Sequence, residues 1–128
     1  MSDIISLTWK LIQQMERSMD ISKKNRIKEA DRLRVRIKNL IWSKAGKIRG
    51  FNPKKTRKDR CGAIIKYDNY GDFTSKFGWE IDHVRPVSKR GKRNLMNLQP
   101  LHIKNNRSKS DKHPVWKCSK PKKKSMKN

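Results

Sequence analysis

The chain has 128 residues, which suits one small domain or one domain with an arm, because domains most often have about 100–150 residues. Lysine and arginine number 35 against 11 acidic residues, giving a net charge of +24. A folded chain with this charge repels itself unless polyanions neutralise it, so cations and small hydrophobic ligands are poor candidates for its main partner. The charge favours DNA or RNA, and an anionic membrane surface is the lesser alternative.

The sequence also excludes several classes of protein. There is no apolar run of about 18 residues, so no transmembrane helix is expected. The N-terminus lacks the basic and apolar regions of a secretory signal, and an intracellular location is expected, cytoplasmic or, in a eukaryotic host, nuclear. Cys61 and Cys118 are far apart and form no CxxC pair, which argues against a disulfide framework and a four-cysteine zinc site. Both are expected to be free thiols.

Residues 1–48 are expected to form a basic helical arm or a helical hairpin. An amphipathic helix is predicted over residues 3–19, because apolar residues recur there mostly at spacings of three and four. Ser22 is a candidate cap for a second helix, from about Lys23 to Ala45, which glycines then end. The apolar residues of the first helix are Ile4, Ile5, Leu7, Leu11, Ile12, Met15 and Met19.

The second predicted helix is strongly basic. Its residues Arg32, Arg34 and Arg36 are interpreted as contacts for nucleic-acid phosphates. The alternative is a merely solvated face, which is what runs of charge usually form. The net charge of the chain favours phosphate contact.

Residues 49–111 are expected to hold the main domain. A turn-rich stretch contains one short strand, in CGAIIKY. A strand is predicted over 79–84, ended by Pro86, and a second over 95–101, with a loop between them. A short polar helix over 102–109 follows, so the order is strand, loop, strand, helix. The fold class is therefore α+β.

Residues 112–128 contain seven lysines and no acidic residue. Pro114 and Pro121 interrupt any helix, and a disordered basic tail is expected. Nonspecific affinity for DNA is its simplest role, and a nuclear-localisation signal is the alternative.

The residues that indicate chemistry are Asp82, His83, Asn97 and Asn106. Hydrolysis of a phosphodiester needs a group that takes a proton from water, and a neutral imidazole suits this task. It also needs stabilisation of the negative charge on the phosphate and the departing 3′ oxygen, which a divalent ion held by oxygen ligands supplies. Asp82 and Asn106 offer such oxygens, and the Asn97 amide is placed to bond backbone across the loop and hold His83.

The segment WEIDHVRPVS…NLMNLQPLH…NNRSKSD resembles the HNH endonucleases, a family with a ββα-metal fold. The Asp-His pair, the central Asn and the helix Asn match that family's motif in type and spacing, and the HNH domain of CRISPR RNA-guided nucleases has a similar pattern. The resemblance is strong over about residues 79–111 and weaker from about Arg57. It implies that His83 is the general base, that Asp82 and Asn106 hold Mg²⁺ or Mn²⁺, and that Asn97 orients the histidine.

Two departures from the family pattern affect the expected site. Many HNH proteins carry a structural zinc held by two CxxC pairs, whereas this chain has none, so no structural zinc is expected and apolar residues should pack that region. Some members have a further metal ligand where this chain has Ser110, so water should complete the metal's shell. The role of His102 stays open between metal or phosphate contact and packing or capping.

The sequence therefore predicts a metal-dependent endonuclease that acts on DNA, most simply double-stranded, with no membrane partner, as a monomer or homodimer. Its candidate DNA contacts are basic residues around the predicted strands and helix. A noncatalytic basic protein that binds or packages nucleic acid is the alternative, because charge alone serves both functions. The contacts are Arg85, Lys89, Arg90, Lys104, Arg107 and Lys109, together with the three arginines of the arm.

Overall fold

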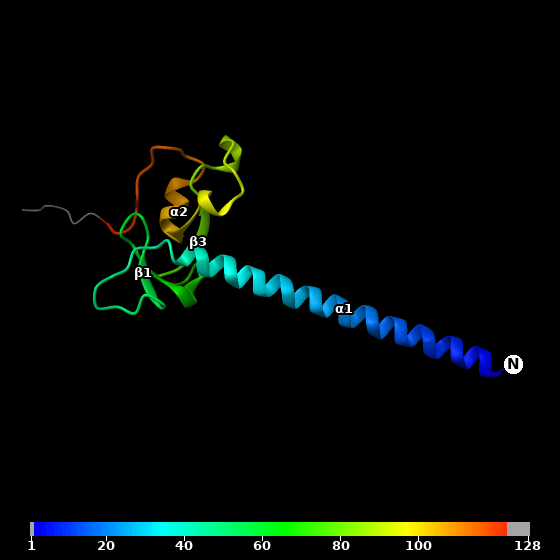
Figure 1. Cartoon of the computed structure of the whole chain (residues 1–128). Coiled ribbons are helices and arrows are strands. Elements are labelled where there is room, and N and C mark those ends of the chain that lie inside the picture. Colours follow the sequence, from blue (N-terminus) through cyan, green and yellow to red (C-terminus); the bar gives the residue numbers. More distant parts are fainter. Residues whose placement is uncertain (1, 123–128) are drawn as a thin grey trace, which may run out of the picture. The chain divides into compact units, whose positions relative to one another are not determined.

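The computed structural model describes residues 2–122 and has an α+β architecture of helices and small antiparallel sheets (Figure 1). Two compact units are present, Met1–Ile37 and Lys38–Asn128. Residues 38–48 were expected to close the basic arm, but they belong to the second unit. None of the helices in the described residues combines the length and apolar character that a membrane crossing needs.

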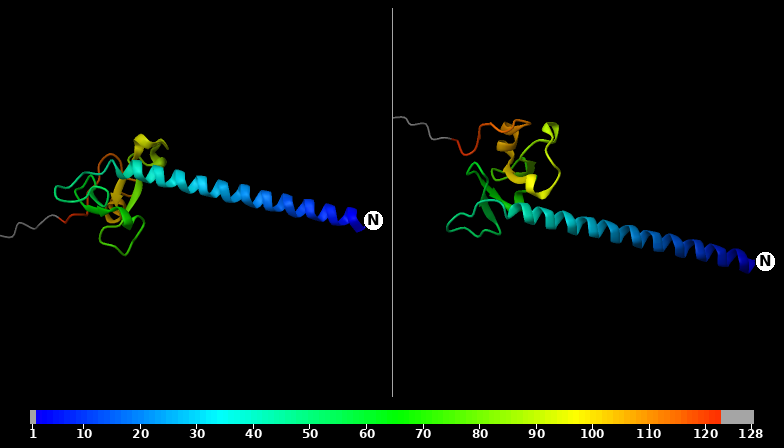
Figure 2. Two further views of the ribbon diagram at one scale, coloured as in Figure 1. Left: turned by 60° about the horizontal axis from the view of Figure 1, so that its bottom comes forward. Right: turned by 45° about the horizontal axis from the view of Figure 1, so that its top comes forward.

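The N-terminal residues form one helix, α1 (Ser2–Trp42), and the predicted break near Ser22 is wrong (Figure 2). The segment Asp20–Ser22 contains no glycine or proline, and serine in a helix interior costs only a few tenths of a kcal/mol. A residue suited to cap a helix therefore does not start a new one unless the chain must turn. The alternative of a helical hairpin is excluded, because the helix continues through the residues that would form its turn.

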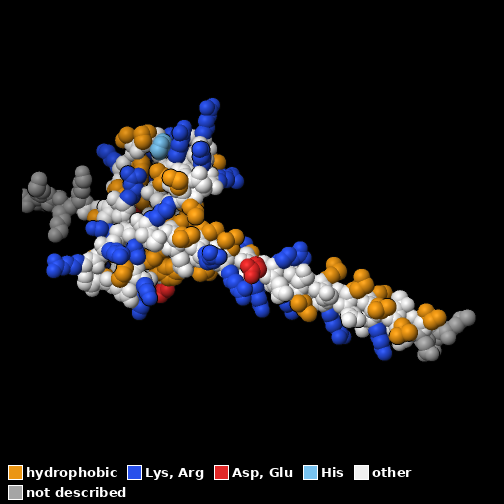
Figure 3. All heavy atoms as spheres, in the orientation of Figure 1, with side chains coloured by type: hydrophobic (Ala, Val, Ile, Leu, Met, Phe, Trp, Pro, Cys, Tyr) orange, Lys and Arg blue, Asp and Glu red, His pale blue; other side chains and the backbone are white. Residues whose placement is uncertain are grey.

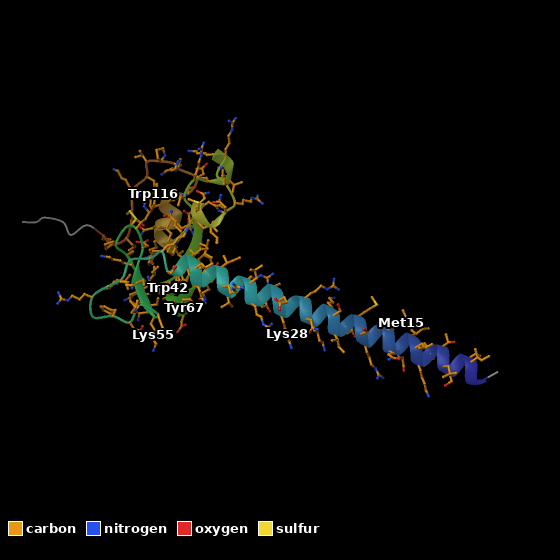
Figure 4. All side chains as sticks on the ribbon, viewed as in Figure 1. Met15, Lys28, Trp42, Lys55, Tyr67 and Trp116 are labelled. Carbon is orange, nitrogen blue, oxygen red and sulfur yellow. A yellow bond between two sulfur atoms is a disulfide. The ribbon has the colours of Figure 1, made fainter. Side chains whose placement is uncertain are left out.

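The end of α1 lies in the second unit and enters its core. Trp42 packs against Trp79 with ring centroids 5.1 Å apart and meets Tyr67 edge to face (Figure 4). The Trp42 indole N–H donates to the carbonyl of Pro53 at 2.9 Å. The Arg57 guanidinium donates to the carbonyls of Ser43 and Ala45, just beyond the last helical turn. The last carbonyls of α1, which a helix leaves without intrahelical partners, accept from the next turn, where the backbone N–H groups of Lys44 and Ala45 donate to Ile41 and Trp42 at 3.0 Å.

Two antiparallel strand pairs build the rest of the core. β1 (Thr56–Lys58) pairs with β2 (Ile64–Lys66), which lies inside the short strand predicted from CGAIIKY. β3 (Trp79–His83) pairs with β4 (Leu98–His102), and α2 (Ile103–Lys109) follows directly. The predicted order of strand, loop, strand and helix is confirmed.

One boundary in this unit differs from the prediction. The second strand was expected from Leu95, but a 3-10 helix, η3 (Leu95–Asn97), comes first. The Asn94 side chain caps that turn by accepting from the backbone N–H of Asn97 at 3.2 Å. A local capping bond therefore outweighs the apolar pattern that suggested a longer strand.

The segment after α2 is mostly exposed but is attached to the domain at Cys118, Ser119 and Lys120, which corrects the expectation that the tail is free from residue 112. Cys118 forms a disulfide with Cys61, so the expectation of two free thiols is wrong. The Asn105 side chain accepts from the backbone N–H groups of Ser119 and Lys120 at 2.9 and 2.8 Å, and the segment runs beside α2 in Figures 1 and 2. The rest of the predicted tail, residues 123–128, lies outside the described residues.

A buried carboxylate joins these parts. Asp59 is 4% exposed and accepts four hydrogen bonds, two of them from the backbone of its own turn. The other two come from the backbone of His102 at 3.0 Å and the side chain of Asn105 at 2.8 Å. Apolar packing alone was expected to hold this region, whereas a polar network and a disulfide also hold it.

Candidate functional site

The face of β3 that lies against α2 carries two carboxylates. Glu80 and Asp82 are two residues apart and share this face, because successive side chains of a strand alternate. From α2, the Asn106 side chain donates to Glu80 at 2.7 Å, and the Lys109 ammonium lies 3.2 Å from Asp82. The structure therefore brings Asp82 and Asn106 onto facing surfaces of adjacent elements.

The ion pair of Lys109 with Asp82 is enclosed. The Lys109 side chain is 1% exposed and that of Asp82 is 10% exposed. The ammonium also donates to the backbone carbonyl of His83 at 2.8 Å, and Gln99 donates to the other side of Asp82 at 2.9 Å. Lys109 was expected to contact DNA phosphates, and this is wrong because its charge is directed inward. It instead fixes the last two residues of β3 to α2.

His83 ends β3 opposite Leu98 and is half-buried. Strand alternation sends its side chain to the other side of β3 from Asp82. The end of the strand therefore has the Asp82 carboxylate on one side and the His83 imidazole on the other. A phosphate bound across the end of β3 would therefore have the carboxylate on one side and the imidazole on the other.

Asn97 braces the loop that follows His83. Its amide accepts from the backbone N–H of Arg85 at 2.9 Å and donates to the carbonyls of Arg85 and Lys92 at 3.0 and 2.8 Å. Its backbone carbonyl accepts from Val84 at 2.8 Å. The prediction that the Asn97 amide bonds backbone across the loop is confirmed.

A glycine completes this loop. A Cβ on Gly91 would lie 1.7 Å from the carbonyl oxygen of Arg85, so any side chain there would force the backbone apart. Gly91 also donates from its N–H to the carbonyl of Pro86 at 2.9 Å. The loop after His83 therefore has a fixed path although it is largely exposed.

The donor set fits a magnesium-type ion in its chemistry. A carboxylate has about four acceptor positions, and Lys109 and Gln99 use up to three of those on Asp82. Asn106 donates through its nitrogen, so its side-chain oxygen is the atom that could coordinate an ion. Mg²⁺ typically takes one or two carboxylates and keeps several waters. In the described residues, no group of three or more His, Cys, Asp and Glu side chains is arranged to hold a metal.

His102 has a structural role as the N-cap of α2. It is 3% exposed, and its Nδ1 accepts from the backbone N–H of Lys104 at 3.0 Å, which caps α2. Its Nε2 lies 2.8 Å from the carbonyl of Lys76. Both ring nitrogens are engaged, which favours the capping interpretation over metal contact.

Basic side chains surround the loop after β3. A cavity of about 360 Å³ is lined by Arg85, Arg90 and Lys92, with Asn94 and Asn97 supplying amides. Arg85 also donates to the carbonyl of Lys89 at 2.6 Å. Lys92 was absent from the predicted contacts, although its position in a glycine-containing basic loop was a usable signal. Figure 3 shows how widely Lys and Arg side chains cover the visible surface.

A second basic group lies where α2 meets the C-terminal segment. The charge of Lys104 lowers the pKa of Lys120, and desolvation and the charges of Lys122 and Lys76 act in the same direction. Such crowding of like charges is relieved when an anion binds. Lys104 was predicted to contact nucleic acid. Lys76, Lys120 and Lys122 were not, because they are distant from Lys104 in the sequence and lie near it only in the folded chain. Arg107 lies over the Phe73 ring, 5.0 Å from its centroid.

The arginines of α1 are exposed, and two of them have acidic neighbours. Arg32 pairs with Glu29 at 3.1 Å and Arg34 with Asp31 at 2.8 Å. Exposed pairs at this spacing contribute only a few tenths of a kcal/mol, so they do not prevent exchange for phosphate contacts.

Sequence reasoning missed the partners that fix the site. Gln99 donates to Asp82, and Glu80 accepts from Asn106. Lys109 forms an ion pair with Asp82. Alternation along β3 placed Glu80 beside Asp82, but the register that brings Gln99 opposite Asp82 depends on pairing that the sequence does not state. In comparisons with family models, curated proteins and solved structures, none matches this chain.

Proposed function

We propose that the protein is a metal-dependent DNA endonuclease of the HNH type and that the β3, β4 and α2 unit is its ββα-metal core. One observation carries the proposal: α2 holds an amide and a cation against the carboxylates of β3, while the next residue, His83, leaves the strand on the other side. Binding alone needs no imidazole beside a carboxylate. In-line displacement at phosphorus needs groups on both sides of the phosphate.

His83 is the proposed general base. Its imidazole takes the proton of the attacking water, the water oxygen bonds phosphorus, and the bond from phosphorus to the 3′ oxygen breaks. Asn97 acts through the backbone, because its bonds to Arg85 fix the chain two residues beyond the base. A general base contributes about 10²–10⁴-fold when it is held in place.

Asp82 and Asn106 are the proposed ligands of Mg²⁺ or Mn²⁺, which when bound stabilises negative charge on the phosphate and the leaving oxygen. Lys109 keeps the Asp82 carboxylate oriented toward α2, and Gln99 fixes its other side. Glu80 fixes Asn106 in the same way by accepting from its amide nitrogen.

Basic residues around the site are the proposed contacts with the DNA backbone. Arg90 and Lys92 line the cavity beside the loop that follows the base. Lys104 and Lys120 form the second group, which α2 and the C-terminal segment share. Each phosphate contact should make binding salt-dependent, because it releases condensed counterions.

The test is nicking of supercoiled plasmid with Mg²⁺ or Mn²⁺, with and without EDTA. We expect His83→Ala to lower the cleavage rate by at least about 10²-fold while keeping DNA affinity. Added imidazole should restore part of the lost rate, which a structural defect would not allow. His113→Ala is the matched control, because it removes a histidine outside the strand, loop, strand and helix unit.

Two outcomes would contradict the proposal. If folded His83→Ala cleaves DNA at the wild-type rate, His83 is not the general base. A wild-type protein that binds DNA but does not cut it with either ion would favour the noncatalytic alternative.

A further inference from the structure

The first half of α1 exposes a continuous apolar face. Eight large apolar side chains between residues 4 and 19 are 42–74% exposed, and the helical period places seven of them on this face and Trp9 away from it. Figure 3 shows hydrophobic side chains gathered on this part of the helix. Thr8 lies within the same face, and its hydroxyl donates to the carbonyl of Ile4 at 2.8 Å, so it can be buried without losing its hydrogen bond. The seven are Ile4, Ile5, Leu7, Leu11, Ile12, Met15 and Met19.

Five of these residues and Thr8 have a spacing that reads the same in both directions. Residues 4, 8, 11, 12, 15 and 19 are spaced symmetrically about the midpoint between Leu11 and Ile12, whereas Ile5 and Leu7 lie outside this symmetric set. Two antiparallel copies related by a twofold axis at that midpoint would bring Ile4 against Met19 and Thr8 against Met15. An isologous contact of this kind requires a surface that is complementary to itself.

The charge of α1 changes just beyond the end of this apolar face. Residues 4–21 contain two basic and two acidic residues, whereas residues 22–42 contain eight basic and two acidic residues. Met15 lies in the neutral part and Lys28 in the basic part (Figure 4). A near-neutral segment in a chain of charge +24 can approach its own copy without local repulsion.

We propose that residues 4–19 of α1 pair with the same residues of a second copy of this chain, in an antiparallel arrangement. Parallel pairing would set the two basic halves side by side. Antiparallel pairing sends them to opposite ends of a contact about 24 Å long, which exceeds the Debye length of about 8–10 Å. The proposal does not depend on nuclease activity.

The available area suits a dimer. Side chains of this size carry roughly 60–120 Å² of apolar surface each, so the exposed fractions leave roughly 250–550 Å² per copy. A standard interface buries about 800 Å² per partner, of which rather more than half is apolar. An anionic membrane fits less well, because helices that lie on membranes carry many Lys and Arg beside the apolar face.

The first test is sedimentation of the full chain, free of nucleic acid, in about 1 M salt, where the Debye length is about 3 Å. Wild type should sediment as a dimer, because high salt weakens association through bound nucleic acid but leaves apolar contacts intact. Leu11→Glu with Ile12→Glu should weaken association at least about 100-fold, since it places charge at the centre of the contact. Ser6→Glu with Gln13→Glu adds the same charge on the polar face and should leave the dimer intact.

The second test concerns direction. A Thr8→Cys variant mixed with a Met15→Cys variant should cross-link between copies, while either variant alone should not. Cross-linking of Met15→Cys to itself would contradict the antiparallel arrangement. A monomeric wild type, equal behaviour of the two glutamate pairs, or a monomer that binds anionic phospholipid vesicles through this face would each overturn the proposal.

Discussion

Lys109 is a lysine whose whole side chain is enclosed by the protein, which is rare because burying a charge is costly unless it is paired. Its ammonium has contacts with both oxygens of Asp82 and with the carbonyl of His83. Removing one partner of such a pair leaves an uncompensated charge. The pair therefore links the stability of the domain to the geometry of the site.

Lys109→Met should lower the free energy of unfolding by about 3–5 kcal/mol, because it leaves the Asp82 carboxylate enclosed without its cation. Chemical denaturation measures the change. Lys89→Met is the control, since this exposed lysine should change stability by less than about 0.5 kcal/mol. Adding Asp82→Asn to Lys109→Met should recover part of the loss, and a double variant no more stable than the single one would contradict this account.

Asn97 uses both the oxygen and the nitrogen of its amide to fix the loop after His83. Its loss should therefore slow the proposed reaction, although its side chain bonds only backbone groups of the loop. Asn97→Ala should lower the cleavage rate by about 10–100-fold, the range typical of residues that orient catalytic groups. Asn97→Asp keeps the acceptor for Arg85 N–H but loses both donated bonds, so it should be similarly impaired. A plasmid-nicking assay measures both variants, and Ser88→Ala is the control, because Ser88 is exposed in the same loop. Equal rates for Asn97→Ala and Ser88→Ala would refute the bracing role.

At the scale of elements, local pattern was enough where neighbours in the chain decide the structure. Alternation predicted the strand that carries Asp82 and His83, Pro86 marked its end, and α2 was predicted one residue longer than observed. The continuous course of α1 was missed because a residue suited to cap a helix was taken as evidence for a break.

Contacts between distant residues could not be predicted in the same way. Nothing near Cys61 indicates that Cys118 lies beside it, and nothing near Asp59 indicates His102 and Asn105. Each contact depends on the completed fold. For the same reason, Asp82 and Asn106 were identified as site residues, but the bonds that hold them were not.

Cys118→Ser should destabilise the domain, because the disulfide constrains the unfolded chain over a long loop. In the chain-entropy treatment, a separation of 57 residues corresponds to about 4 kcal/mol. The measurement is denaturation of wild type and variant without reductant, with reduced wild type as the control that should match the variant. A variant as stable as the oxidised wild type would contradict the stabilising role of this bond.

At the scale of the whole molecule, charge should govern affinity and the site should govern rate. Replacing Arg32, Arg34 and Arg36 with Gln should reduce the slope of log K against log salt by up to about 0.9 for each duplex phosphate that an arginine no longer neutralises. Binding across a salt series measures the slope, and the cleavage rate at saturating DNA should remain unchanged. Replacing Gln13, Gln14 and Asn25 with Ala is a control on the same helix. An unchanged slope would mean that the arginine face is only solvated.

The bonds from Asn105 to Ser119 and Lys120 also determine when the domain can be completed during synthesis. The ribosome delivers α1, the strands and α2 before it delivers these two residues. Until they emerge, the buried side-chain oxygen of Asn105 lacks the backbone donors that enclose it, and Cys61 has no partner until Cys118 appears. Domains usually fold as units as the chain appears. Here the segment made after α2 closes the unit that contains His83, so the nascent domain reaches its finished form only once Lys120 has left the ribosome.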